Sequence, residues 1–154
     1  MITTSLRARE NSTELYKKGA ALALSGDINA AIEIFRRVVA ISPEYTLGHY
    51  GLGKALLYTD GGVEDAVLHL RKAVTLDRRF AKGYFYLGMG LMLSRRYVLA
   101  LHAFEKAYRY DTSIIEALYN SAVIYDLLQK RRRAQWYYDE YLYMKKKGRM
   151  DILF

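Results

Sequence analysis

The chain repeats one pattern about every 34 residues, and this repeat constrains the fold more than any other feature of the sequence. Small residues recur at Gly19, Gly53, Gly88 and Ala122. An alanine follows each of them, and a bulky apolar residue lies four positions beyond that alanine. These pairs are Ala31 and Phe35, Ala66 and Leu70, Ala100 and Phe104, and Ala134 and Tyr138. A period of this length is typical of helix–turn–helix repeats, so we predict an all-α chain of four helical hairpins.

Turn residues divide the chain into eight predicted helices. Gly26-Asp27 ends the first helix and supplies a cap for the second, and Asp60-Gly61-Gly62 does the same in the second hairpin. The predicted helices cover residues 13–25, 28–41, 45–58, 63–76, 81–94, 97–110, 115–128 and 131–147. Asn11 and Glu14 have the spacing of a capping box, which predicts the start of the first helix, and Gly148 predicts the end of the last.

The predicted domain organisation follows from these signals. Four repeats occupy residues 12–147, as units 12–45, 46–80, 81–114 and 115–147. An N-terminal extension, residues 1–11, precedes them, and a C-terminal tail, residues 148–154, follows them. The small residues should let paired helices approach closely, while the bulky residues fill the space between hairpins. No hairpin buries its apolar face alone, so we expect stability only from the array.

The repeat resembles the tetratricopeptide repeat family over residues 12–147. The first unit carries Leu15, Tyr16, Gly19 and Pro43 at matching positions, and the third unit matches nearly as well. The fourth is the most divergent, with Ala122 in place of glycine. The resemblance implies a right-handed α-solenoid whose first helices line an inner groove. It implies a non-catalytic scaffold or adaptor that binds protein partners, although the family is too general to identify the partner.

The charge and the composition narrow the classes of partner. The net charge is +8, with seven basic and six acidic residues in residues 1–60 against seventeen and ten in residues 61–154. This excess favours an acidic protein or an anionic membrane surface. No nucleic-acid motif is present, so we do not expect nucleic-acid binding. Cysteine is absent, no apolar run reaches about 20 residues, and residues 1–9 lack the apolar core of a secretory signal. We therefore expect a cytoplasmic protein, peripheral to a membrane-associated complex.

The groove that the resemblance implies carries an aromatic stripe. Tyr16, Tyr50, Phe85 and Tyr119 occupy equivalent places in successive repeats. The predicted groove residues are Tyr16, Tyr50, Lys54, Leu57, Tyr58, Lys82, Phe85, Met89, Met92, Tyr119 and Val123. An aromatic and methionine-rich surface favours an apolar extended segment or an amphipathic helix as the ligand. The alternatives are that these side chains are ordinary interhelical packing, or that the chain's own tail covers them.

The best-known ligand site of the family clamps a peptide's C-terminal carboxylate with lysine, asparagine and arginine. The matching positions here are Tyr16, Ala20, Gly51, Lys82 and Tyr86, of which only Lys82 agrees. Aligning the clamp positions one repeat further along the chain gives no better match. We therefore predict that this clamp is absent.

Two further features remain as candidate interaction sites. A basic edge is predicted at two hairpin turns, formed by Arg95, Arg96, Lys130, Arg131, Arg132 and Arg133. It would attract an acidic protein or membrane, or it would simply be a solvated surface. The tail Asp151–Phe154 ends in three apolar residues. It would cap the last repeat, enter a neighbour's groove and build a homo-oligomer, or stay disordered.

The sequence contains no complete motif for catalysis, nucleotide binding or metal binding. Residues 48–54 match the spacing of a phosphate loop, but Ala55 stands where Ser or Thr must bind magnesium, and no strand precedes the segment. His49, His69 and His102 show no metal-ligand spacing, so we expect no metal site. No catalytic pair and no cofactor motif are present. The leading prediction is an adaptor or scaffold; the alternatives are a secretion-type chaperone that shields an apolar client segment and a self-assembling coat protein.

Overall fold

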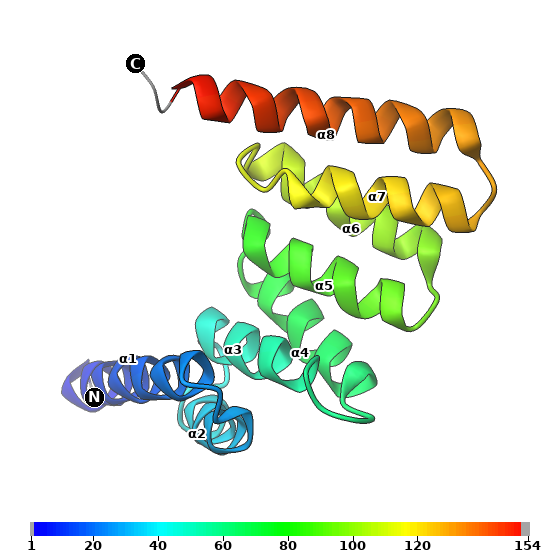
Figure 1. Ribbon diagram of the computed structural model, residues 1–154. Helices are drawn as coiled ribbons and strands as arrows, with labels where there is room; N and C mark the ends of the chain where they lie inside the picture. The colour runs from blue at the N-terminus through cyan, green and yellow to red at the C-terminus, as the bar shows by residue number, and fades with distance from the viewer. Residues whose placement is uncertain (1, 152–154) are drawn as a thin grey trace. The chain divides into compact units, whose positions relative to one another are not determined.

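The computed structural model describes the backbone of residues 2–151 and the side chains of residues 11–148. Within that range the chain is all-α, with eight helices and no strand (Figure 1). The helices are α1 (Ile2–Leu24), α2 (Ile28–Ile41), α3 (Thr46–Leu56), α4 (Val63–Leu76), α5 (Ala81–Leu93), α6 (Tyr97–Tyr110), α7 (Glu116–Leu127) and α8 (Arg131–Asp151). Consecutive helices pair as four hairpins, and the chain divides into two compact units, residues 1–79 and 80–154.

In the first unit, Phe35 of α2 is the central packing residue. A Cβ atom added to Gly19 of α1 would lie 2.7 Å from Phe35 Cε1, and one added to Gly51 of α3 would lie 2.6 Å from the same atom. Phe35 therefore fills the space between α1 and α3, and only glycine leaves room for its ring on both sides. In the next hairpin, a Cβ at Gly53 would lie 2.6 Å from Leu70 Cγ. The predicted pairing of small and bulky residues is confirmed in both hairpins of this unit.

In the second unit the same packing of an aromatic ring against a glycine occurs at Phe104 of α6, which is fully buried. A Cβ atom added to Gly88 of α5 would lie 2.6 Å from Phe104 Cε1. Ala100 and Ala107, on the same helix, are also completely buried. The α6 helix packs against both α5 and α7, and α7 packs against α8. Phe104 is thus the core residue that joins the third hairpin to the fourth.

The predicted turn chemistry is confirmed in the first hairpin. Gly26 has a φ of 91°, which is the left-handed region that glycine adopts without strain. The Asp27 side chain then accepts a hydrogen bond of 3.1 Å from the backbone N–H of Ala30 and caps α2. The two turns of the second unit use non-glycine residues instead, since Arg95 and Gln129 have φ values of 59° and 57°.

Both ends of the chain differ from the prediction. The α1 helix begins at Ile2 rather than near residue 13, so Asn11 lies inside the helix and the predicted capping box is wrong. Residues 2–12 contain no glycine or proline and include good helix formers, so the helix continues in the N-terminal direction. Likewise α8 runs through Gly148 to Asp151, so Gly148 does not end it. Of the predicted tail, residues 152–154 lie outside the described part of the chain.

None of the described helices is long and apolar enough to cross a membrane.

Candidate functional site

In the second unit, α5 and α7 carry several of the predicted groove residues, and a side-chain hydrogen bond links the two helices. Phe85, Met89 and Met92 are half-buried and spaced along one side of α5, as residues three and four apart on a helix are. The α7 helix contributes Tyr119 and Val123. The amide Nδ2 of Asn120 on α7 donates a hydrogen bond of 3.3 Å to Met89 Sδ on α5. This contact joins the two helices, and we call the five residues Phe85, Met89, Met92, Tyr119 and Val123 the α5–α7 face.

The aromatic residues of the α5–α7 face are held from behind by other rings. Phe85 packs on the buried Phe104, with ring centroids 5.8 Å apart. Tyr119 lies 5.7 Å from the ring of Tyr138 and 5.4 Å from that of Tyr141, both on α8. Even so, Tyr119 remains 46% exposed. A large ring that is fixed on one side and open on the other is suited to bind a partner at low entropic cost.

The predicted groove residues of the first unit lie in varied surroundings. Tyr16 of α1 packs on Phe35 at 5.6 Å and meets Tyr45 edge-on at 6.2 Å. Burial raises the pKa of Tyr16, and Tyr45 raises it further. Lys54 and Leu57 are half-buried, and Tyr58 is exposed. Lys82, which the prediction placed in the same groove, is exposed at the start of α5 in the second unit.

Tyr50 corrects the predicted groove. Its side chain was expected to line an open surface, but it is only 8% exposed. The reason is the position of α3, which packs against α1, α2 and α4, so that residues 48–53 are all buried. For Tyr50 the alternative of ordinary interhelical packing is the correct one.

The basic edge lies at the two turns of the second unit. The α5–α6 turn carries Arg95 and Arg96, and the α7–α8 turn carries Lys130 followed by Arg131–Arg133; all six residues are exposed. Figure 1 shows both turns at the same end of these hairpins. The guanidinium of Arg133 lies over the ring of Tyr125, 5.6 Å from its centroid. Several exposed cations therefore gather at one end of the unit, where an anionic surface would be attracted.

The structure also brings together two histidines whose spacing in the sequence did not indicate a contact. The Nδ1 atoms of His49 on α3 and His69 on α4 lie 3.0 Å apart, and His49 Nε2 lies 2.8 Å from the carbonyl oxygen of Pro43. Across the described residues, no three His, Cys, Asp or Glu side chains are grouped closely enough to hold a metal ion. The pair is thus a local hydrogen-bonded element of the first unit.

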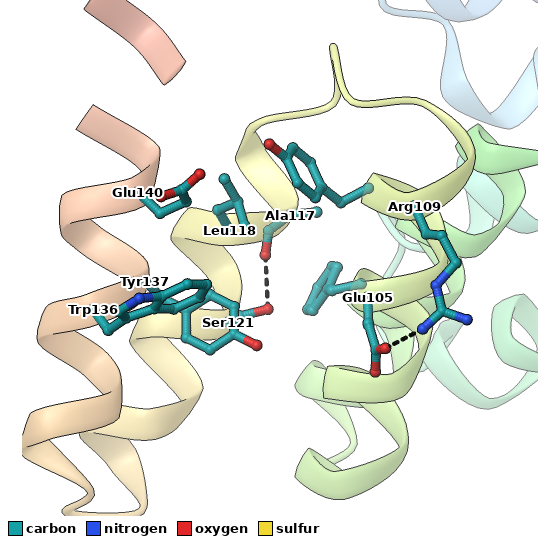
Figure 2. Close-up of a pocket in the computed structure, with 10 residues that line it drawn as sticks. Glu105, Arg109, Ala117, Leu118, Ser121, Trp136, Tyr137 and Glu140 are labelled. Atoms are coloured by element: carbon teal, nitrogen blue, oxygen red, sulfur yellow. Dashed lines mark hydrogen bonds and ion pairs between the residues drawn. The ribbon is translucent and has the colours of Figure 1, made fainter. Parts of the chain in front are cut away.

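A pocket in the second unit was missed altogether by the sequence analysis. It has a volume of about 340 Å³ and lies between α6, α7 and α8 (Figure 2). Phe104 and Leu118 belong to its apolar lining, and Tyr108, Trp136 and Tyr137 bring three further aromatic side chains. The available signal was the single tryptophan of the chain, on a second helix and four residues before Glu140.

Comparison with known proteins identifies the repeat. No protein-family model matches the chain. A segment of 101 residues is 28% identical to the small glutamine-rich tetratricopeptide repeat-containing protein 2 of Mycosarcoma maydis; the match covers 65% of this chain and 28% of that protein. The match thus spans little more than a quarter of that relative's length.

Solved structures share the whole fold. The crystal structure of MamA superposes with a TM-score of 0.85 at 25% identity, covering 96% of this chain and 86% of that one. The first TPR of Spaghetti (RPAP3), bound to an HSP90 peptide, superposes with a TM-score of 0.74 at 18% identity, covering 78% of this chain and 94% of that one. With the repeat pattern and the eight helices, these likenesses show that the chain has the tetratricopeptide repeat fold, an all-α solenoid of four helical hairpins.

Proposed function

We propose that the protein is a non-catalytic adaptor that binds an apolar or amphipathic segment of a partner protein on its α5–α7 face. The observation that carries the proposal is the contact of Asn120 with Met89, which joins α5 to α7, the helix that carries the exposed Tyr119. The result is a surface of fixed aromatic rings and adaptable methionine side chains. Such a surface fits apolar anchors spaced along an extended strand or along one side of a helix.

Related structures support a peptide as the class of ligand. The RPAP3 repeat domain, which shares the fold, is bound to an HSP90 peptide. Of the positions that clamp a peptide carboxylate in the family, only Lys82 is matched in this chain. We therefore propose that apolar contacts with Phe85, Met92 and Tyr119, rather than a carboxylate clamp, supply most of the binding free energy.

The basic edge adds an electrostatic part to the proposal. Its exposed arginines and lysine would attract an acidic region of the same partner, or an anionic membrane to which the partner is bound. The edge and the α5–α7 face belong to the same unit, so one partner can engage both.

Affinity capture from the native source tests the proposal. The bait is the wild-type chain beside Tyr119→Ala and the control Tyr143→Ala, which removes an equally large ring that is 61% exposed on α8 and is not part of the α5–α7 face. We expect at least one partner to be retained by the wild type and by the control and to be lost with Tyr119→Ala. Identical partners for all three baits would refute the α5–α7 face as the binding surface.

A further inference from the structure

The pocket between α6, α7 and α8 lies on the other side of α7 from the α5–α7 face. Its α7 lining includes Ala117 and Ser121, which are four residues apart and share one side of the helix. Tyr119 and Val123 are shifted from them by two residues, which corresponds to about 200° around a helix. A ligand in this pocket would therefore leave the α5–α7 face free.

Aromatic rings dominate the chemistry of the pocket. Trp136 and Tyr137 of α8 meet edge to face, with centroids 4.8 Å apart and planes at 88°, and Tyr108 faces them from α6. Trp136 remains 58% exposed, so its ring is accessible to a partner, and tryptophan is enriched among the residues that anchor protein contacts. The faces of such rings attract cations, and tryptophan does so most strongly.

Carboxylates give the pocket a negative charge within a chain whose net charge is +8. Glu105 of α6 and Glu140 of α8 both line it (Figure 2). Arg109, the single basic residue of the lining, is paired with Glu105. Burial raises the pKa of Tyr108, and the charge of the half-buried Glu140, which lines the same pocket from α8, raises it further. The lining residues themselves, two carboxylates and one guanidinium, carry about one net negative charge, while Arg133 acts on the Tyr137 ring from outside the lining.

We propose that this pocket binds the side chain of a lysine or arginine that a partner protein presents. The alkyl stem would lie on the half-buried rings of Tyr108 and Tyr137, and the charged group would lie between the Trp136 ring and the Glu140 carboxylate. A pocket of about 340 Å³ has room for such a side chain. This ligand class differs from the apolar segment assigned to the α5–α7 face. The proposal for the pocket therefore does not depend on the proposal for that face.

The single tryptophan of the chain makes the test direct, because the indole N–H of Trp136, which lines the pocket, gives a unique NMR signal. The full chain is titrated at constant ionic strength with Nα-acetyl-lysine methylamide and Nα-acetyl-arginine methylamide. The norleucine analogue is the control ligand, since it keeps the alkyl stem and lacks the charge. We expect a saturable shift of the indole signal with the cationic probes and none with norleucine.

Two variants decide whether the pocket carboxylate is responsible. Glu140→Gln removes the charge that faces the rings, and we expect it to weaken probe binding about tenfold. Asp139→Asn, the matched control, removes the same charge from the neighbouring exposed residue, which accepts a hydrogen bond from Gln135 instead. It should bind the probes as the wild type does. Equal melting temperatures of the three proteins exclude unfolding as the cause.

Three results would overturn the assignment. The first is a shift of equal size with norleucine, which would make the pocket merely apolar. The second is binding by Glu140→Gln at wild-type strength. The third is an indole signal that shifts with protein concentration alone, because the occupant would then be a basic side chain of a second copy and not of a separate partner.

Discussion

The rings of His49 and His69 stack with their centroids 5.3 Å apart and their Nδ1 atoms only 3.0 Å apart. Since His49 Nε2 faces the carbonyl oxygen of Pro43, that nitrogen must donate its proton, and in the neutral pair His49 Nδ1 accepts from the N–H of His69. Both rings cannot be protonated together, because two N–H groups would then face each other. The pair thus couples the second hairpin to the loop that precedes it.

This geometry predicts that acid destabilises the first unit. Burial lowers the pKa of His69, and the neighbouring His49 lowers it further; Asp65 opposes this and Arg36 adds to it. A histidine in an unfolded chain has a pKa of roughly 6.5, so below that pH the unfolded state binds more protons than the folded state. Stability should therefore fall as the pH decreases from 7.5 to 5.5, measured as the melting temperature. His69→Gln should reduce this fall, whereas His102→Gln, on an exposed position of α6, should leave it unchanged. Equal pH dependence in all three proteins would refute the role of the pair.

The close approach of Gly88 to Phe104 predicts opposite effects of one substitution at two sites. Gly88→Ala places a Cβ 2.6 Å from a fully buried ring, and we expect a loss of about 1–3 kcal/mol in the free energy of unfolding. Gly148→Ala, also within a helix, meets nothing within 4 Å and should instead stabilise the chain by about 0.5–1 kcal/mol. Urea denaturation measures both. A stable Gly88→Ala protein would contradict the packing of the third hairpin.

The basic edge predicts salt-dependent binding to anionic surfaces. The wild-type chain should bind phosphatidylserine-containing vesicles at low salt and be released as the salt concentration increases, because the interaction is screened. Removing two charges with Arg131→Ser and Arg132→Ser should weaken the binding several-fold. Removing two charges from exposed positions of the first unit, with Lys18→Ser and Arg37→Ser, is the control and should have a smaller effect. Equal losses from both double variants would show that net charge alone is responsible.

The interior of the fold could be predicted from the sequence, because the repeated positions are the ones at which the helices pack against each other. Gly19, Gly53 and Gly88 each face the bulky residue that the spacing assigned to them, so the hairpins and their pairing followed directly. The chain ends could not be predicted in the same way. Asn11 has the spacing of a capping residue, but the residues on both sides of it favour a helix, so α1 continues through this position.

The candidate sites were harder to predict because burial depends on neighbours. Tyr50 and Tyr119 occupy equivalent repeat positions, yet Tyr50 lies in the enclosed α3 helix and Tyr119 keeps an open side. The two histidines are twenty residues apart in sequence and on different helices, so no local spacing revealed their contact. The pocket likewise combines side chains of α6, α7 and α8, and no spacing within a single helix indicated that they line one cavity.

The central claim, that partners bind on the α5–α7 face, is tested most directly by site-specific photocrosslinking in the native source. The photoreactive residue p-benzoylphenylalanine replaces Tyr119 in one protein and the exposed Tyr143 in the control. Irradiation should give discrete adducts with a partner protein from position 119 and none of the same mass from position 143. The same adducts from both positions, or none from position 119 while a partner is still captured, would contradict the account.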